Sequence, residues 1–131
     1  IVYHPMKYAE LLREKIVKHN TKVWLVNTGW SGGIYGRGNR YPINFTRKIV
    51  DDINNNLLEN TEYEKLDVFN LEIPLNINGL DSNMLNPKNN WTNKLNYDKY
   101  RNKLSKMFID NFKKYQDHEL FSELIKVGPD E

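Results

Sequence analysis

Apolar residues recur at helical spacing in several parts of the chain. Leu11, Leu12 and Ile16 repeat over residues 6–18, with charged residues mostly on the other side. This pattern predicts an amphipathic helix that follows Pro5 and ends at Asn20, a residue that adopts left-handed backbone conformations readily. A second helix is predicted from Asn44, as N-cap, into the asparagine run 54–56, because apolar residues follow at intervals of four: Phe45, Ile49, Ile53 and Leu57.

A longer apolar stripe occupies the last third of the chain. It comprises Tyr97, Tyr100, Leu104, Met107, Phe108, Phe112 and Tyr115, and predicts a long helix from about Tyr97. We interpret this stripe as core rather than as a docking surface. A short last helix is predicted over residues 120–125, closed by Gly128 and Pro129.

Two shorter stretches have the pattern of strands. Val23–Val26 is continuously apolar, which is typical of a strand buried on both faces of a mixed or parallel sheet. The stretch from Lys65 to Pro74 alternates enough to predict another strand. Helices that alternate with such strands indicate an α/β (α+β mixed) fold.

Composition excludes several classes of protein. The 131 residues fit one domain able to bury a core, and 39% hydrophobic with 12% aromatic residues argues against disorder. A formal charge of +2 is too small for a typical nucleic-acid or anionic-membrane binder. The absence of cysteine excludes thiolate metal sites and fits a reducing, cytoplasmic compartment. No apolar run is long enough to span a bilayer, and the non-methionine start suggests a piece of a longer protein.

Five of the seven glycines lie in one loop, residues 29–38, between a predicted strand and a predicted helix. Such a loop allows a backbone to approach a flat or anionic ligand closely. A phosphate loop, G-x-x-x-x-G-K-S/T, is excluded because Asn39 and Arg40 occupy the places of its Lys and Ser/Thr. A dinucleotide fingerprint is excluded because Tyr41 occupies the place of its last glycine.

The loop still carries groups that could bind a nucleotide. Arg40 offers a planar cation for a phosphate or a base, and Thr46 offers a hydroxyl beside the first N–H groups of a helix. Stacking faces come from three aromatic residues: Trp30, Tyr35 and Tyr41. Simpler interpretations stay open, because the aromatics could be core, Thr46 could bond its own backbone, and Arg37 could be a solvated charge. The residues alone indicate a mononucleotide or other anion site.

An ordered series of motifs resembles the ATP-dependent phosphoenolpyruvate carboxykinases along essentially the whole chain. The central match is N-T-G-W at 27–30, followed by G-G-x-Y-G-x-G-x-R at 32–40 and T-R at 46–47. Flanking matches include His4-Pro5, Phe69-Asn70-Leu71, Leu85-Asn86-Pro87, the run 108–112 with Tyr115, and Gly128-Pro129. The resemblance implies a mixed sheet flanked by helices, with residues 1–131 forming the C-terminal part of a nucleotide-binding domain.

The resemblance also implies a reaction, the conversion of oxaloacetate and ATP to phosphoenolpyruvate, ADP and carbon dioxide. It assigns contacts on the adenosine side of the nucleotide to Arg40, Tyr41 and Thr46. Asn39 stands where the family commonly has Lys, and Tyr41 where it commonly has Ile. The family's phosphate loop, its ligands for Mg²⁺ or Mn²⁺ and its substrate-binding arginine are expected upstream of residue 1. We therefore expect no metal site and no catalytic residue in this chain, and no activity from it alone.

Two other classes of function remain alternatives. The loop could be a stacking platform for single-stranded nucleic acid, although the lysines are scattered rather than grouped. The chain could also be a non-catalytic interaction domain that docks a partner through its long helix. We favour the nucleotide site, with ATP or ADP and oxaloacetate as ligands of the whole enzyme and neither nucleic acid nor membrane as a partner. Apolar surface exposed in the isolated piece predicts self-association.

Overall fold

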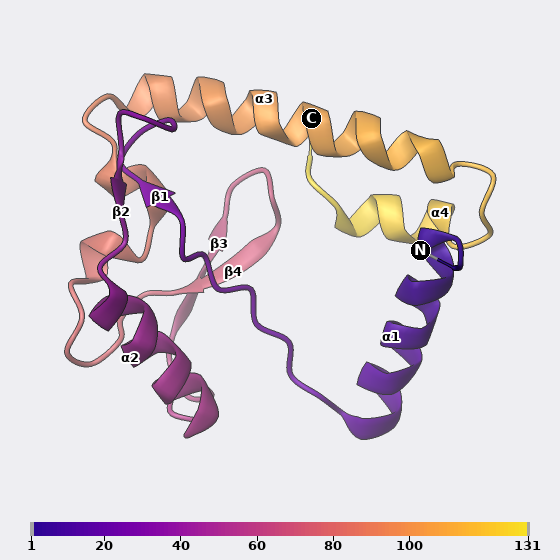
Figure 1. The fold of residues 1–131 in the computed structure, drawn as a ribbon, viewed down its shortest axis with the longest axis horizontal. Coiled ribbons are helices and arrows are strands. Elements are labelled where there is room, and N and C mark those ends of the chain that lie inside the picture. Colours follow the sequence, from indigo (N-terminus) through magenta and orange to yellow (C-terminus); the bar gives the residue numbers. More distant parts are fainter. Residues whose placement is uncertain (1, 131) are drawn as a thin grey trace.

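The computed structural model describes residues 2–130 (Figure 1). In chain order, its helices and strands are α1 (Pro5–His19), β1 (Trp30–Ser31), β2 (Asn39–Arg40), α2 (Ile43–Asn54), β3 (Tyr63–Leu66), β4 (Leu71–Pro74), α3 (Lys94–Phe112) and α4 (Phe121–Leu124). Short 3₁₀ helices complete the set: η1 (Ser82–Met84), η2 (Pro87–Asn90), η3 (Lys113–Tyr115) and η4 (Ile125–Val127).

The first helix agrees with its sequence signals. Pro5 occupies the first turn of α1, and the Nδ1 atom of His4 accepts a hydrogen bond from the backbone N–H of Met6 at 3.3 Å. At the other end, Asn20 has a φ of 48°, and its N–H reaches the carbonyls of Ile16 and Val17. The predicted left-handed C-terminal residue is therefore confirmed.

The second and third helices begin earlier than predicted. Helix α2 starts at Ile43, so Asn44 lies inside the helix and the prediction of Asn44 as N-cap is wrong. The backbone of Pro42, with φ −57° and ψ 138°, leads directly into the first turn instead. Helix α3 starts at Lys94, where the side chain of Asn93 accepts from the N–H of Asn96 at 3.0 Å. The predicted short C-terminal helix is confirmed as α4 with η4.

The apolar run Val23–Val26 is extended but is not a strand of any sheet that the structure describes. It belongs to the long connection between α1 and β1 that crosses one side of the molecule in Figure 1. The side chains of Val23 and Leu25 are 60% and 79% exposed. The prediction that Val23–Val26 is a strand buried on both faces is wrong for the described residues. A strand needs a neighbouring strand to hydrogen-bond to, and burial on both faces needs other elements packed against each face.

The stretch 65–74 is also not a single strand. Strands β3 and β4 form an antiparallel hairpin that pairs Tyr63 with Pro74 and Leu66 with Leu71. Between them the chain reverses through a turn in which Val68 and Asn70 have φ values of 72° and 57°. A positive φ is unusual for a β-branched residue such as Val68. The alternating pattern of apolar and polar residues therefore did not indicate a turn at this position.

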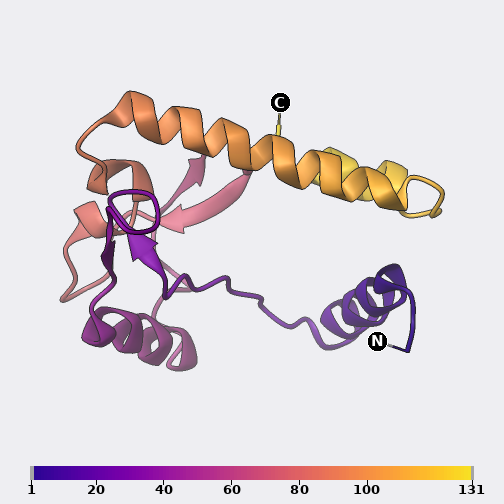
Figure 2. The same ribbon diagram turned by 45° about the horizontal axis from the view of Figure 1, so that its top comes forward.

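The C-terminal segment holds the β3–β4 turn in place. The side-chain amide of Asn70 donates to the carbonyl of Gly128 at 2.9 Å, and the N–H of Asp130 donates to the carbonyl of Val68 at 2.7 Å. The hydroxyl of Ser105, which is 2% exposed, donates to the carbonyl of Asp130 at 2.7 Å. These bonds join the hairpin, the chain end and the middle of α3, whose relative positions Figure 2 shows.

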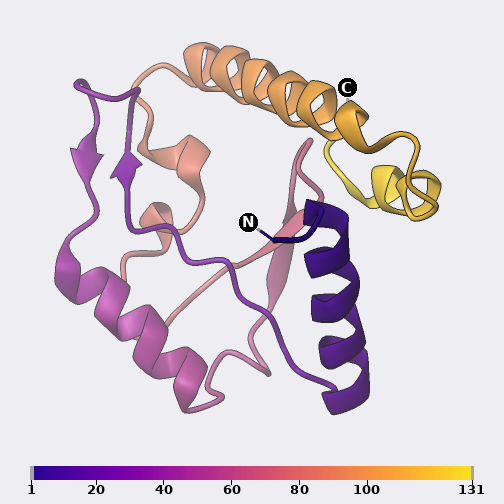
Figure 3. The same ribbon diagram turned by 45° about the vertical axis from the view of Figure 1, so that its right-hand side comes forward.

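The mixed α/β class is confirmed. The described strands form two separate two-stranded antiparallel sheets, β1–β2 and β3–β4, where the family resemblance implied one mixed sheet. In Figure 3, α1 lies on one side of the molecule, α2 lies on the other, and α3 runs across the top.

The buried hydrophobic set is small. Among residues 2–130 it consists of Met6, Phe45, Leu58, Ile77 and Tyr97. The interpretation of the α3 stripe as core holds for Tyr97 but is wrong for four residues whose side chains are 40%, 45%, 58% and 54% exposed: Tyr100, Leu104, Met107 and Phe108. The β3–β4 turn and the chain end pack on α3 at Ser105, and Phe69 contacts Phe108 edge to face at 6.1 Å, but much of the stripe from Tyr100 to Phe108 stays an apolar surface.

Candidate nucleotide-binding site

The glycine loop is closed into a hairpin by β1 and β2. Trp30 pairs with Arg40, and Ser31 pairs with Asn39, in antiparallel register. Residues directly opposite in an antiparallel pair place their side chains on the same face, so Trp30 and Arg40 share one face of the hairpin. The sequence predicted a loop that begins at the end of a strand near Val26, and the structure instead starts the pairing at Trp30.

Glycines allow the two sides of the hairpin to approach each other. A Cβ atom on Gly38 would lie 2.5 Å from the carbonyl oxygen of Ser31, and one on Gly33 would lie 2.9 Å from the nitrogen of Gly38. The N–H groups of Arg37 and Gly38 both donate to the carbonyl of Ile34, at 2.9 and 3.0 Å. Any larger residue at Gly38 would push the two strands apart.

The hairpin also contacts the segment Ser82–Asn90, which we call the support segment. Gly32 has a φ of 78°, and a Cβ atom there would lie 2.8 Å from the carbonyl oxygen of Asn90. The side-chain amide of Asn90 donates to the carbonyl of Met84 at 3.3 Å within the support segment. Glycine at position 32 is therefore required both by backbone conformation and by close packing.

The three predicted site residues lie in and beside the junction of β2 and α2. Arg40 is exposed, and its side chain has no hydrogen bond or ion pair with any described residue. Thr46 is half-buried in the first turn of α2, where its N–H donates to the carbonyl of Pro42 at 3.3 Å. Its hydroxyl has no partner within residues 2–130, so the interpretation that Thr46 bonds its own backbone is wrong. The guanidinium and this hydroxyl are available to a ligand.

Tyr41 is engaged by its own chain. Its ring stacks on Phe45, with centroids 5.4 Å apart and planes 16° from parallel. Its hydroxyl donates to the carbonyl of Met84 at 3.4 Å, and its N–H donates to the carbonyl of Gly29 at 3.1 Å. Tyr41 is therefore a structural part of the junction rather than a free stacking face.

The other two aromatic residues of the loop are more accessible. Trp30 and Tyr35 contact each other edge to face at 5.5 Å and are 41% and 84% exposed. The interpretation of the loop aromatics as core is therefore wrong for these two residues. Arg37 is exposed and makes no ion pair in the part of the chain that is described, as expected of a solvated charge.

Sequence reasoning missed the residues that hold the support segment to α3. The Nζ atom of Lys88 lies 2.9 and 3.0 Å from the two carboxylate oxygens of Asp98, and Arg101 approaches the same carboxylate at 3.1 Å. The hydrogen bond from Lys88 lowers the pKa of Asp98 below its ordinary value. Burial raises the pKa of Tyr97, whose ring lies 5.9 Å from the Arg101 guanidinium carbon. No periodicity in the sequence indicates such contacts.

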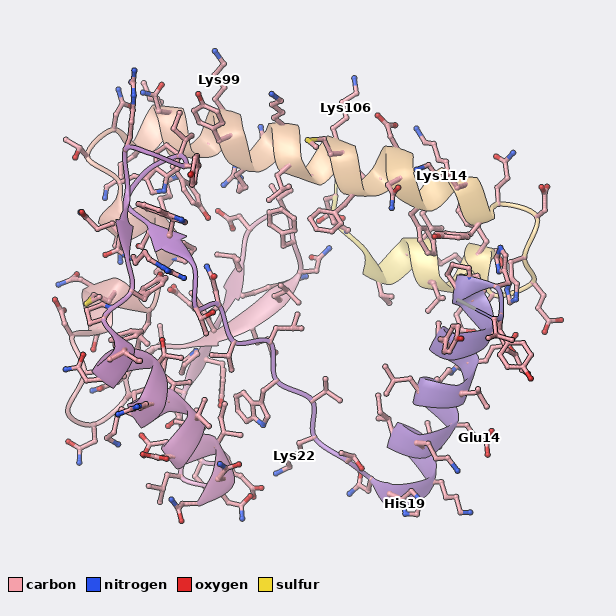
Figure 4. All side chains as sticks on the ribbon, viewed as in Figure 1. Glu14, His19, Lys22, Lys99, Lys106 and Lys114 are labelled. Carbon is pink, nitrogen blue, oxygen red and sulfur yellow. The ribbon has the colours of Figure 1, made fainter. Side chains whose placement is uncertain are left out.

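Arginines lie on and just after the hairpin, at Arg37, Arg40 and Arg47, whereas the lysines are distributed over several elements. Lys99 and Lys106 lie on α3, Lys114 lies on η3, and Lys22 lies on the connection after α1 (Figure 4). A track for a nucleic-acid backbone needs basic groups that converge on one groove.

Acidic and histidine side chains form no metal cluster within residues 2–130. The neighbouring carboxylates of Asp51 and Asp52 lie on different sides of α2. Asp51 is exposed, but Asp52 is 4% exposed and pairs with the Nζ atom of Lys48 at 2.6 Å. Within the same residues, no helix combines the length and the apolar character that crossing a membrane requires.

A hollow of about 420 Å³ lies away from the hairpin, between the start of the extended connection and the end of α2. Its lining includes Lys22, Trp24 and Glu59, and Lys22 and Glu59 form an ion pair at 2.6 Å. None of the three predicted site residues lines this hollow. We therefore place the candidate site at the hairpin, on the free groups of Arg40 and Thr46.

Comparison with known proteins points to one family. The profile described as phosphoenolpyruvate carboxykinase matches residues 1–83. The chain is 48% identical to the phosphoenolpyruvate carboxykinase (ATP) of Campylobacter lari over 126 residues, 96% of this chain and 24% of that protein. It is 44% identical to the protein of the same name from Dictyostelium discoideum over 129 residues, 98% of this chain and 23% of that protein. The chain thus spans about a quarter of the length of the curated relatives it matches.

Proposed function

This chain belongs to the phosphoenolpyruvate carboxykinase family, and we propose that it supplies the adenosine side of the ATP site of such an enzyme. The whole enzyme would convert oxaloacetate and ATP to phosphoenolpyruvate, ADP and carbon dioxide. Loss of carbon dioxide from oxaloacetate leaves an enolate oxygen, and that oxygen accepts the γ-phosphoryl group of ATP. Residues 1–131 would be the C-terminal part of the nucleotide-binding domain.

The observation that carries the proposal is the pair of unengaged groups at the junction of β2 and α2. Arg40 presents a guanidinium with no partner among the described residues, and Thr46 presents a free hydroxyl in the first turn of α2. A planar cation can lie on a purine ring or donate to ribose and phosphate oxygens. The hydroxyl of Thr46 can donate to or accept from the sugar or the base.

The chemistry of phosphoryl transfer would belong to the rest of the enzyme. Phosphoryl transfer needs divalent metal ions, which spread the charge of the transferring group. Residues 2–130 hold no cluster of carboxylates and imidazoles that fits such an ion. We therefore assign neither Mg²⁺ nor Mn²⁺ to these residues, and we propose that this chain alone does not turn over substrate. A cytoplasmic location is part of the same proposal.

A binding experiment tests the nucleotide site. Titration of the chain with ADP should show binding that Arg40→Ala weakens by about tenfold, which corresponds to the loss of one hydrogen bond to a charged group. Arg37→Ala is the matched control, because Arg37 is an exposed arginine of the same hairpin and should leave the affinity unchanged. Nuclear magnetic resonance shifts should concentrate at residues 29–46. Shifts that avoid this region would contradict the proposal.

A second measurement separates the nucleotide site from the nucleic-acid alternative. Binding of ADP should exceed binding of a single-stranded oligonucleotide and should depend weakly on salt. Preferential oligonucleotide binding that weakens steeply with salt would favour the alternative. An assay with ATP, oxaloacetate and manganese should detect no phosphoenolpyruvate from this chain, and measurable product would refute the assignment of catalysis to the rest of the enzyme.

A further inference from the structure

The junction between β2 and α2 decides where Arg40 and Thr46 lie relative to each other. Arg40 ends β2, Thr46 lies in the first turn of α2, and the chain between them changes direction at Tyr41 and Pro42. Pro42 restricts one backbone angle, but the remaining rotations around the junction must be limited by contacts. The geometry of the two free groups therefore depends on what holds Tyr41.

Tyr41 is held from three sides. Its N–H bonds to the carbonyl of Gly29 across the hairpin, and its ring lies flat on Phe45, which is 7% exposed. Its hydroxyl points at the carbonyl of Met84 in the support segment. An apolar contact between the residue before a helix and one in its first turns limits the angle at which the chain enters the helix. The stack of Tyr41 on Phe45 is such a contact.

We propose that the side chain of Tyr41 is a positioning group of the nucleotide site, which acts through the stack of its ring on Phe45 and not through contact between the ring and the nucleotide. The stack holds α2 at one angle to the hairpin and so holds Thr46 at one position relative to Arg40. This inference rests on the proposed function, because it assigns a role to a residue of the same site. It predicts that the ring matters and that the hydroxyl, at 3.4 Å from its acceptor, matters little.

Three variants at two positions test the role of the ring. Tyr41→Ala removes the stack, Tyr41→Phe keeps it, and Tyr3→Ala removes a 61% exposed tyrosine outside the hairpin as a control. We expect Tyr41→Ala to raise amide hydrogen exchange over residues 38–46 and the Kd for ADP by about two- to tenfold, the size of an aromatic pair. Tyr41→Phe and Tyr3→Ala should leave both quantities within about twofold of wild type. If Tyr41→Ala does not fold, Phe45→Leu removes the partner ring and serves the same purpose.

A double-variant comparison separates positioning from direct contact. If Tyr41 acts by placing Arg40, Tyr41→Ala should raise the Kd for ADP less in an Arg40→Ala background than in wild type. Equal effects in the two backgrounds would mean that the ring contacts the nucleotide itself, and would overturn the inference. An unchanged rate of amide hydrogen exchange over residues 38–46 in Tyr41→Ala would also overturn the inference.

The exchange measurement needs no nucleotide, so it distinguishes the two proposals. Absence of ADP binding by the wild-type chain would refute the proposed function. Faster exchange in Tyr41→Ala with normal exchange in Tyr41→Phe would then still establish the stack as the contact that holds the junction. Faster exchange with an unchanged Kd would refute the role of Tyr41 in nucleotide binding.

Discussion

Trp30 lies directly opposite Arg40 in the antiparallel pair that closes the glycine loop. This pairing closes the glycine loop, residues 29–38, into a hairpin with one defined face. The face carries the unpaired guanidinium that we assign to the nucleotide. The site therefore depends on closure of the hairpin, which the close approach of Gly38 to Ser31 permits.

Gly38→Ala should destabilise the chain by about 1–3 kcal/mol, because its Cβ atom would lie 2.5 Å from the carbonyl oxygen of Ser31. Gly29→Ala is the control, since the nearest atom to its Cβ is a side-chain oxygen of Asn27 that can move away. Urea unfolding followed by tryptophan fluorescence measures both. Equal midpoints for the two variants would contradict the close packing of the hairpin.

The ion pair between Lys48 and Asp52 should matter more than an ordinary surface pair. Asp52 is 4% exposed, so Lys48→Ala leaves a buried carboxylate without its partner and should lower the unfolding free energy by about 1–3 kcal/mol. Adding Asp52→Asn to Lys48→Ala should recover part of this loss, because the uncompensated charge is gone. Lys15→Ala, an exposed lysine of α1, should change stability by less than about 0.5 kcal/mol. Additive effects of the two changes would show that the side chains do not interact.

Acid should weaken the attachment of the support segment to α3. The hydrogen bond from Lys88 makes the pKa of Asp98 lower in the folded chain than its ordinary value of 3.8. A carboxylate with a lowered pKa stabilises the fold above that ordinary value, and this stabilisation is lost as the pH falls through the folded-state pKa. The difference in unfolding free energy between wild type and Asp98→Asn should be largest near neutral pH and shrink below 3.8.

Asp51→Asn is the matched control for the pH experiment, because Asp51 is exposed and makes no ion pair with any described residue. Urea titrations at several pH values measure all three proteins. A difference between wild type and Asp98→Asn that stays constant down to the most acidic pH would exclude the Lys88–Asp98 contact.

Exposed apolar surface should make the isolated chain associate. Leu25 and Met107 are 79% and 58% exposed, one on the extended connection and one on α3. Light scattering should give an apparent mass that rises with protein concentration, and Leu25→Lys with Met107→Lys should reduce the rise. Lysine at the already polar positions Thr21 and Asn102 is the control and should leave the rise unchanged. A strict monomer at high concentration would refute this prediction.

Local signals explain most of the successful predictions. Helix α1 was predictable because Pro5, Asn20 and the apolar repeat between them act within a few residues of one another. The start of α2 was misplaced because Asn44 has the right chemistry for a cap, while the conformation of Pro42 had already begun the helix. The β3–β4 turn was missed because Val68 adopts a positive φ that contacts with the chain end support.

By itself, the sequence determined the helical segments, the family and the concentration of glycine around Arg40, because these depend on residue type and on neighbours along the chain. Tertiary structure decided that the loop closes through Trp30, that Tyr41 stacks on Phe45, and that Val23–Val26 pairs with no strand among residues 2–130. The physical reason is that pairing, stacking and burial need a second surface, and the position of that surface depends on residues far along the chain.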